Sequence, residues 1–174
     1  LDFLVQSAES VLRRRPRQVT FLGPLVTYLL VFAAGTQHVI YALLPVIAEV
    51  SRRAGIRPER PLSISVIAAL QGVIASPVSA VTVALAGVLA VQGVGLPQIL
   101  LIVIPSTVLG IAAGIGSVWW RGAELTLDPE YLQRLQEGKV KPVEETVPLQ
   151  GDARKRAIGS CIVFLLAILA VVAI

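Results

Sequence analysis

A single histidine, His38, lies in a polar interruption of a long apolar stretch, in the order Gly35, Thr36, Gln37 and His38. No Asp, Glu, Lys or Arg occurs between 19 and 48. An imidazole can carry a proton or a positive charge, and hydroxyl and amide groups can donate hydrogen bonds. Ionisable side chains inside a membrane are rare and usually functional. We therefore predict that these four residues contribute to an anion-binding site; the alternative for His38 is a bond to a neighbouring helix.

A second interruption falls inside the apolar segment 62–91, where Ala75, Ser76, Pro77 and Ser79 occur together. Proline removes a backbone donor and clashes with the preceding helical turn, so a helix is expected to break or kink here. A broken helix presents unpaired N–H groups and the positive end of its dipole, and both attract carboxylates. We predict that these four residues contribute to the same site. The alternative is a simple proline kink whose freed carbonyl is satisfied by a serine.

Arginine clusters bracket the first apolar stretch and decide its orientation. They are Arg13, Arg14, Arg15 and Arg17 on one side and Arg52, Arg53, Arg57 and Arg60 on the other. Loops rich in Arg and Lys stay on the cytoplasmic side, so both ends of the stretch are expected there. Two full crossings would need about 40 residues at about 20 each, which is more than the stretch provides. The sequence therefore predicts a re-entrant helical hairpin over 19–50 with its tip at 35–38.

The other segments complete an all-α, multi-pass membrane protein. The expected order is an amphipathic or cytoplasmic segment over 1–18, the hairpin over 19–50, a cytoplasmic loop over 51–61, a broken transmembrane helix over 62–91, a transmembrane helix over 96–120, a cytoplasmic loop over 121–156 and a truncated transmembrane helix over 157–174. The connector 92–97 is uncharged and is therefore placed outside. Asp128, Pro129 and Gly138 predict a short helix inside the long loop, because they supply an N-cap, a first-turn proline and a glycine stop.

Composition limits the class of protein. Hydrophobic residues make up 55% of the chain and charged residues only 15%, which excludes an ordinary soluble domain. The net charge of +4 reflects the arginine clusters, so it indicates membrane orientation rather than nucleic-acid binding. One cysteine, Cys161, cannot form a disulfide framework. Without a phosphate-binding glycine loop, a metal-ligand cluster or a second histidine, the sequence predicts no enzyme activity, no metal and no cofactor.

Several motifs occur in a specific order along the chain. They are Thr36-Gln37-His38-Val39, Leu44-Pro45-Val46-Ile47-Ala48-Glu49-Val50, Gly55-Ile56-Arg57-Pro58-Glu59-Arg60-Pro61, Ile74-Ala75-Ser76-Pro77-Val78-Ser79-Ala80 and Ile104-Pro105-Ser106-Thr107. Together they resemble the bacterial anaerobic C4-dicarboxylate transporter family. The resemblance implies a secondary transporter that exchanges fumarate, succinate, malate or aspartate across the inner (plasma) membrane. It also implies a relation to ion transporters built from two inverted repeats, so that this chain would supply one half of such a fold.

Members of that family are much longer than this chain, which we therefore interpret as a fragment of the first half and middle. The expected partners are C4-dicarboxylate substrates, the lipid bilayer and the missing second half of the same protein; no nucleic acid is expected, and a homo-oligomer stays open. One residue departs from the family pattern. Members usually have glycine where this chain has Gln37, so a bulkier side chain stands at the predicted tip and the substrate range can differ.

Two other functions stay open from the sequence. The chain could belong to a non-transporting multi-pass scaffold subunit, or to a transporter of the same fold for another organic anion. A transporter needs the two interruptions to face one another at similar depth, whereas a scaffold does not. A further spacing, Gly110 and Gly114, predicts a face for close packing between helices rather than a catalytic feature.

Overall fold

The computed structural model describes residues 11–119 and 124–138, and every regular element in these ranges is helical. The elements are η1 (Pro16–Gln18), α2 (Val19–Ala34), η2 (Gln37–Val39), α3 (Ile40–Arg53), α4 (Glu59–Ala75), α5 (Ala80–Ala90), α6 (Leu96–Trp119), η3 (Leu125–Leu127) and α7 (Pro129–Gln136). The prediction of an all-α chain is thus confirmed for the described residues. The start of the first segment, the transmembrane helix over 157–174 and Cys161 lie outside them.

Three helical stretches among the described residues are long and apolar enough to cross a membrane. They are Pro16–Ala34, Glu59–Ala90 and Leu96–Trp119. Their outer surfaces are apolar as well: Val88, Leu101 and Ile102 are 71%, 77% and 70% exposed. Because large apolar patches on a protein surface indicate contact with a partner or a membrane, these faces fit a lipid environment. The chain is therefore a multi-pass membrane protein in its described part.

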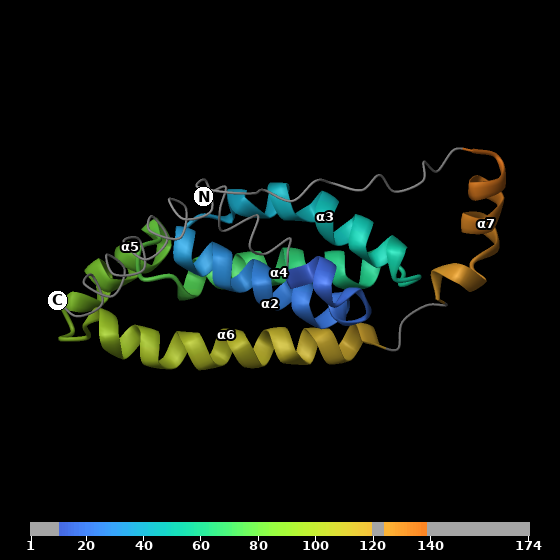
Figure 1. Ribbon diagram of the computed structural model, residues 1–174. Coiled ribbons are helices and arrows are strands. Elements are labelled where there is room, and N and C mark those ends of the chain that lie inside the picture. Colours follow the sequence, from blue (N-terminus) through green and yellow to red (C-terminus); the bar gives the residue numbers. More distant parts are fainter. Residues whose placement is uncertain (1–10, 120–123, 139–174) are drawn as a thin grey trace.

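The helices α2 and α3 form a hairpin (Figure 1). Gly35 ends α2 with φ +68°, and its N–H donates to Val31 O at 2.9 Å. This left-handed conformation favours glycine, because a Cβ would crowd the backbone. Thr36 is then extended, and the chain returns through η2 into α3. Since α3 continues through Arg53 and α4 begins at Glu59, the connector between them covers only 54–58.

The helices α4 and α5 are separated by a break at 76–79. Ser76 is extended, with φ −72° and ψ 126°, and the helix resumes at Ala80. The hydroxyl oxygen of Ser79 accepts from Thr82 N at 3.2 Å and so caps α5. Thr82 Oγ1 donates to the carbonyl of Ile74 at 2.8 Å, which satisfies an acceptor that the interrupted helix leaves without its usual partner.

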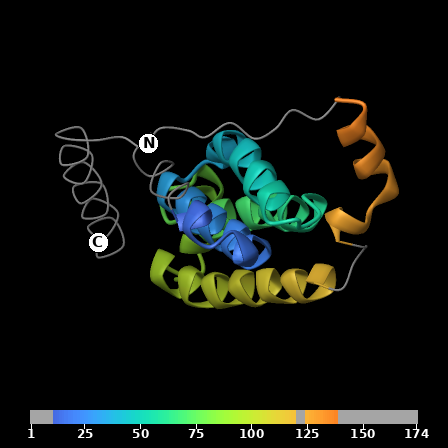
Figure 2. The same ribbon diagram turned by 45° about the vertical axis from the view of Figure 1, so that its right-hand side comes forward.

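Helix α4 lies at the centre of the fold, in contact with α2, α3 and α6 (Figures 1 and 2). One apolar cluster joins α2, α3 and α4 and includes Val31, Leu43 and Ile47; another joins α2, α4 and α6 and includes Ile64 and Ile111. The two clusters hold the hairpin on one side of α4 and α6 on another.

Two details show how closely α2 packs on its neighbours. A Cβ built on Gly72 of α4 would lie 2.9 Å from the backbone oxygen of Tyr28, so glycine is needed for this approach. The hydroxyl of Tyr28 bonds to Thr107 Oγ1 of α6 at 2.9 Å, and both side chains are buried. A paired hydroxyl is required here because an unpaired one costs free energy when it is buried.

Among the described residues, the close packing expected at the two glycines of α6 is confirmed for Gly114. A Cβ on Gly114 would lie 3.2 Å from Ile64 Cδ1, so Gly114 does face a close helix contact with α4. Gly110 has no atom of the described residues within 4 Å of such a Cβ. The two glycines lie one helical turn apart on the same face of α6, and the contact with Ile64 of α4 reaches only Gly114.

The short helix predicted after Asp128 is confirmed as α7. Asp128 Oδ1 accepts from the backbone N–H groups of Glu130 at 3.0 Å and Tyr131 at 3.3 Å. Gly138 follows the helix with φ +66°. This helix lies at the opposite end of the molecule from the hairpin tip (Figure 1).

Candidate functional site

The structure brings the two interruptions together. A Cβ built on Gly35 would lie 2.8 Å from Val78 Cγ2 and 3.2 Å from both the carbonyl carbon and the carbonyl oxygen of Val78. Gly35 is the first residue after α2, and Val78 lies in the break between α4 and α5. The backbone of Gly35 therefore lies against the backbone of Val78, and there is no room for a side chain at position 35.

At the hairpin tip, Thr36 and His38 form a local pair. Thr36 Oγ1 lies 2.7 Å from His38 Nδ1, and the backbone N–H of His38 donates to the same hydroxyl at 3.4 Å. The ring of Tyr41 stands edge-on to the imidazole, with the two ring centroids 6.2 Å apart. Gln37 and His38 are exposed in the described chain, while Thr36 is partly buried. The hydroxyl of Thr36 thus fixes the orientation of the one imidazole and leaves its other edge outward.

In the break itself, the predicted site residues are buried. Ala75 and Ser76 are 0% exposed, Ser79 is 1% exposed, and Pro77 is fully buried as well. Ser76 Oγ accepts from the N–H of Val78 at 3.4 Å. Ala75 is the last residue of α4, and Ser76, Pro77 and Ser79 belong to a compact turn that contacts the hairpin tip through Val78.

The two serines of the break, Ser76 and Ser79, differ in whether their hydroxyl protons are already used in hydrogen bonds. Thr82 has one hydroxyl proton, and Ile74 O accepts it, so the 3.0 Å contact between Ser79 Oγ and Thr82 Oγ1 must use the proton of Ser79. Ser79 is therefore occupied in shaping the break. Ser76 accepts one hydrogen bond, and among the described residues no acceptor for its own proton is found. Of the two, Ser76 is the better donor to a bound anion.

Thr82 and Val78 were missed by sequence reasoning. Thr82 stands three residues after Ser79, which is the spacing of an N-cap serine and the N–H that it caps, so the pattern was available in the sequence. Val78 gave no such signal, because its importance lies in its backbone, which faces Gly35 from a distant part of the chain.

Two cavities lie away from the interruptions. A groove of about 620 Å³ between α3 and α4 is lined by Leu44, Pro45, Ala48, Glu59, Leu62, Ser63 and Val66. A polar cavity of about 290 Å³ is lined by Arg52, Arg57, Pro58, Glu59, Leu125, Asp128, Glu130, Tyr131 and Arg134. Neither contains a predicted site residue. Within 11–119 and 124–138, no group of three His, Cys, Asp or Glu residues could hold a metal ion.

Comparison with known proteins decides the family. All of 1–174 matches the family described as an anaerobic C4-dicarboxylate membrane transporter. The chain belongs to this family. The C4-dicarboxylate transporter DcuA of Wolinella succinogenes is 44% identical over 174 residues, which cover 99% of this chain and 39% of the relative. The DcuA of Escherichia coli K12 is 40% identical over 173 residues, with the same coverage of both chains.

A second branch of the same family is also similar. The anaerobic C4-dicarboxylate transporter DcuB of Escherichia coli O6:H1 is 45% identical over 137 residues, covering 75% of this chain and 30% of the relative. The chain thus spans well under half the length of these relatives. No solved structure matches. Membership confirms the resemblance found in the ordered motifs, and it places the chain in a family of bacterial membrane transporters rather than of enzymes.

Proposed function

We propose that this chain is part of a secondary transporter that exchanges C4-dicarboxylates such as fumarate, succinate, malate and aspartate across the bacterial inner membrane. The observation that carries the proposal is the family match over the whole of 1–174. The curated relatives are themselves named C4-dicarboxylate transporters. The contact between Gly35 and Val78 adds a structural reason, because it joins two helix interruptions of the kind that form midplane binding sites in transporters.

The architecture that fits this function is a re-entrant hairpin beside a broken transmembrane helix, together forming one half of an inverted-repeat transporter. Two lengths support it. The 14 residues of α3 span about 21 Å at about 1.5 Å per residue, less than the hydrocarbon core of about 30 Å. Past the contact with Gly35, α5 continues for 11 residues, or about 16 Å. The tip thus ends part-way along the span Glu59–Ala90, and both ends of the hairpin lie beside the arginine clusters.

Within this architecture each site residue has a role. Gly35 brings the tip onto the break, and Pro77 with Ala75 and Ser79 holds the break open. The Ser76 hydroxyl and the N-terminal end of α5 supply a donor and a positive dipole for a carboxylate. Thr36 orients His38, whose imidazole supplies positive charge or a proton, and Gln37 supplies an amide donor. The remaining length of the full protein is proposed to complete the site.

Exchange in reconstituted vesicles tests the proposed function. The full-length parent is placed in vesicles loaded with succinate, and labelled fumarate is added outside. Uptake is expected only when the vesicles contain a dicarboxylate, since an antiporter moves one substrate outward for each one moved inward. Unlabelled malate and aspartate should compete, whereas acetate, with one carboxylate, should not.

Two controls make the result decisive. Vesicles without protein give the leak, and vesicles loaded with acetate show whether counter-substrate is needed. No uptake by correctly inserted parent would favour a scaffold role. Uptake inhibited only by anions other than C4-dicarboxylates would contradict the substrate class while leaving a transporter of this fold.

A further inference from the structure

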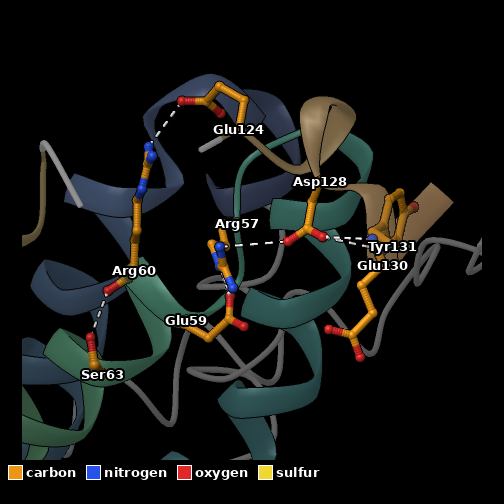
Figure 3. A network of polar contacts seen from close by, with 8 residues as sticks. All are labelled: Arg57, Glu59, Arg60, Ser63, Glu124, Asp128, Glu130 and Tyr131. Carbon is orange, nitrogen blue, oxygen red and sulfur yellow. Dashed lines mark hydrogen bonds and ion pairs between the residues drawn. The ribbon is translucent and has the colours of Figure 1, made fainter. Parts of the chain in front are cut away.

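The segment Glu124–Gly138, which follows α6 and is here named the docked segment, folds back onto the connector 54–58 and the first turn of α4. Arg60 donates to Glu124 Oε1 at 2.9 Å, and the backbone N–H of Leu125 donates to Gly55 O at 3.0 Å (Figure 3 shows the ion pairs). Leu125 is only 6% exposed. One charged contact and one backbone contact therefore fix the start of the segment.

A second ion pair fixes the start of α7. Asp128 Oδ2 lies 3.5 Å from Arg57 Nη1, while Asp128 Oδ1 caps α7 through the N–H groups of Glu130 and Tyr131 (Figure 3). Arg57 Nε also pairs with Glu59 of α4 at 3.2 Å. Asp128 is thus shared between the helix that it begins and the connector on which that helix docks. Docking and the first turn of α7 are coupled through this carboxylate.

These contacts are suited to forming and breaking. The side chain of Arg57 is 37% exposed and that of Glu124 is 49% exposed, so water and salt screen one partner of each pair. Each such pair changes the ratio of docked to undocked segment by about fivefold or less. The polar cavity of about 290 Å³ lies between the connector and α7, so the interface is not closely packed. Leu125 is the buried leucine of the segment, whereas Leu132 and Leu135 are already exposed, so release uncovers little apolar surface beyond Leu125.

The docked segment contacts the part of the chain that connects the two interrupted elements of the candidate site. The connector 54–58 joins the hairpin to the broken helix, and the docked segment follows α6. We propose that the docked segment is a reversible latch on the cytoplasmic side, which restrains the hairpin and the broken helix relative to the end of α6 while it is bound. Release of the latch permits these elements to move during exchange. The inference rests on the proposed function, because exchange is the process that it restrains.

Charge variants test the docking itself. Asp128→Asn keeps a good N-cap residue but removes the charge that faces Arg57. Glu130→Gln is the matched control, because Glu130 pairs with Arg134 inside α7 and not with the connector. In a parent otherwise free of cysteine, Arg60→Cys and Glu124→Cys are joined by a reducible bifunctional thiol reagent, and the yield measures docking. Asp128→Asn should lower the cross-linking yield by up to about fivefold, while Glu130→Gln should leave it unchanged.

The same cross-link tests the latch. Fumarate–succinate exchange should fall when the link is formed and recover when a reductant cleaves it. Asp128→Asn should exchange at least as fast as the unmodified parent. Equal cross-linking in Asp128→Asn and Glu130→Gln would refute the docking, and full exchange by the linked protein would refute the latch alone. A parent that exchanges no dicarboxylate before any linking would instead refute the proposed function.

Discussion

Replacing Gly35 with alanine is expected to reduce dicarboxylate exchange by the full-length parent on the order of tenfold or more, because two costs fall on the same residue. The φ of +68° costs a residue with a Cβ about 1–2 kcal/mol. The new Cβ would also lie 2.8 Å from Val78 Cγ2 and 3.2 Å from the Val78 backbone. A backbone cannot move aside as a side chain can, so the hairpin tip must shift away from the break.

A second glycine separates these two costs. Gly93 has φ +76°, but no atom of the described residues lies within 4 Å of the position that a Cβ would take, so Gly93→Ala carries the conformational cost without the collision. We expect Gly93→Ala to exchange at close to the parental rate. Adding Val78→Ala to Gly35→Ala should recover part of the activity, since it removes the Cγ2 contact but not the backbone contacts. Equal loss in the two glycine variants would show that contact between tip and break is unimportant.

The second large effect is expected on stability, at the crossing of α2 and α4. In Gly72→Ala the Cβ would meet Tyr28 O at 2.9 Å and Val31 Cβ at 3.1 Å. Overpacking of this kind costs typically about 1–3 kcal/mol. In a helix, alanine is also more favourable than glycine by about 1 kcal/mol. The sign of the net change in stability therefore depends on the cost of the collision. Because one partner is backbone, we expect Gly72→Ala to lower the free energy of unfolding.

Gly87→Ala is the matched control, because Gly87 is also inside a helix but has no atom of the described residues within 4 Å of a Cβ. This variant should gain the helix preference alone and be as stable as the parent or more so. Thermal unfolding of detergent-solubilised parent and variants, followed at equal protein concentration, gives the comparison. A Gly72→Ala midpoint at or above that of Gly87→Ala would mean that α2 and α4 are not held at the observed separation.

The positions of the interruptions could be predicted from sequence because their causes are local. A glycine followed by polar residues and a serine–proline pair each disturb a helix whatever surrounds them. The short helix at Asp128 followed from the same kind of signal. The arginine clusters predict that both ends of the hairpin are cytoplasmic, since membrane orientation depends on charge near the ends of apolar segments, and this orientation stays a prediction.

Other features depend on contacts between distant segments, and the sequence did not predict them. Only the structure shows that the hydroxyl proton of Ser79 is bonded to Thr82. This contact leaves Ser76 as the better donor of the two serines. The pairing of Glu49 with Arg13, at 3.0 Å, joins residues far apart in sequence, whereas its pairing with Arg53 follows from helical spacing. The docking of Glu124 on Arg60 had no local signal at all.

The central claim is that the hairpin tip and the break hold the dicarboxylate, and protection of a cysteine at the tip tests it most directly. Gln37→Cys is made in a full-length parent without other cysteines, and its rate of modification by a small water-soluble thiol reagent is measured in reconstituted vesicles. At a succinate concentration about ten times its dissociation constant, occupancy of the site should slow modification by about tenfold. Acetate should have no effect. Gln92→Cys, in the exposed turn after α5, is the matched control and should react equally with and without succinate. An unprotected cysteine at position 37, in a variant that still exchanges fumarate for succinate, would contradict the placement of the substrate between tip and break.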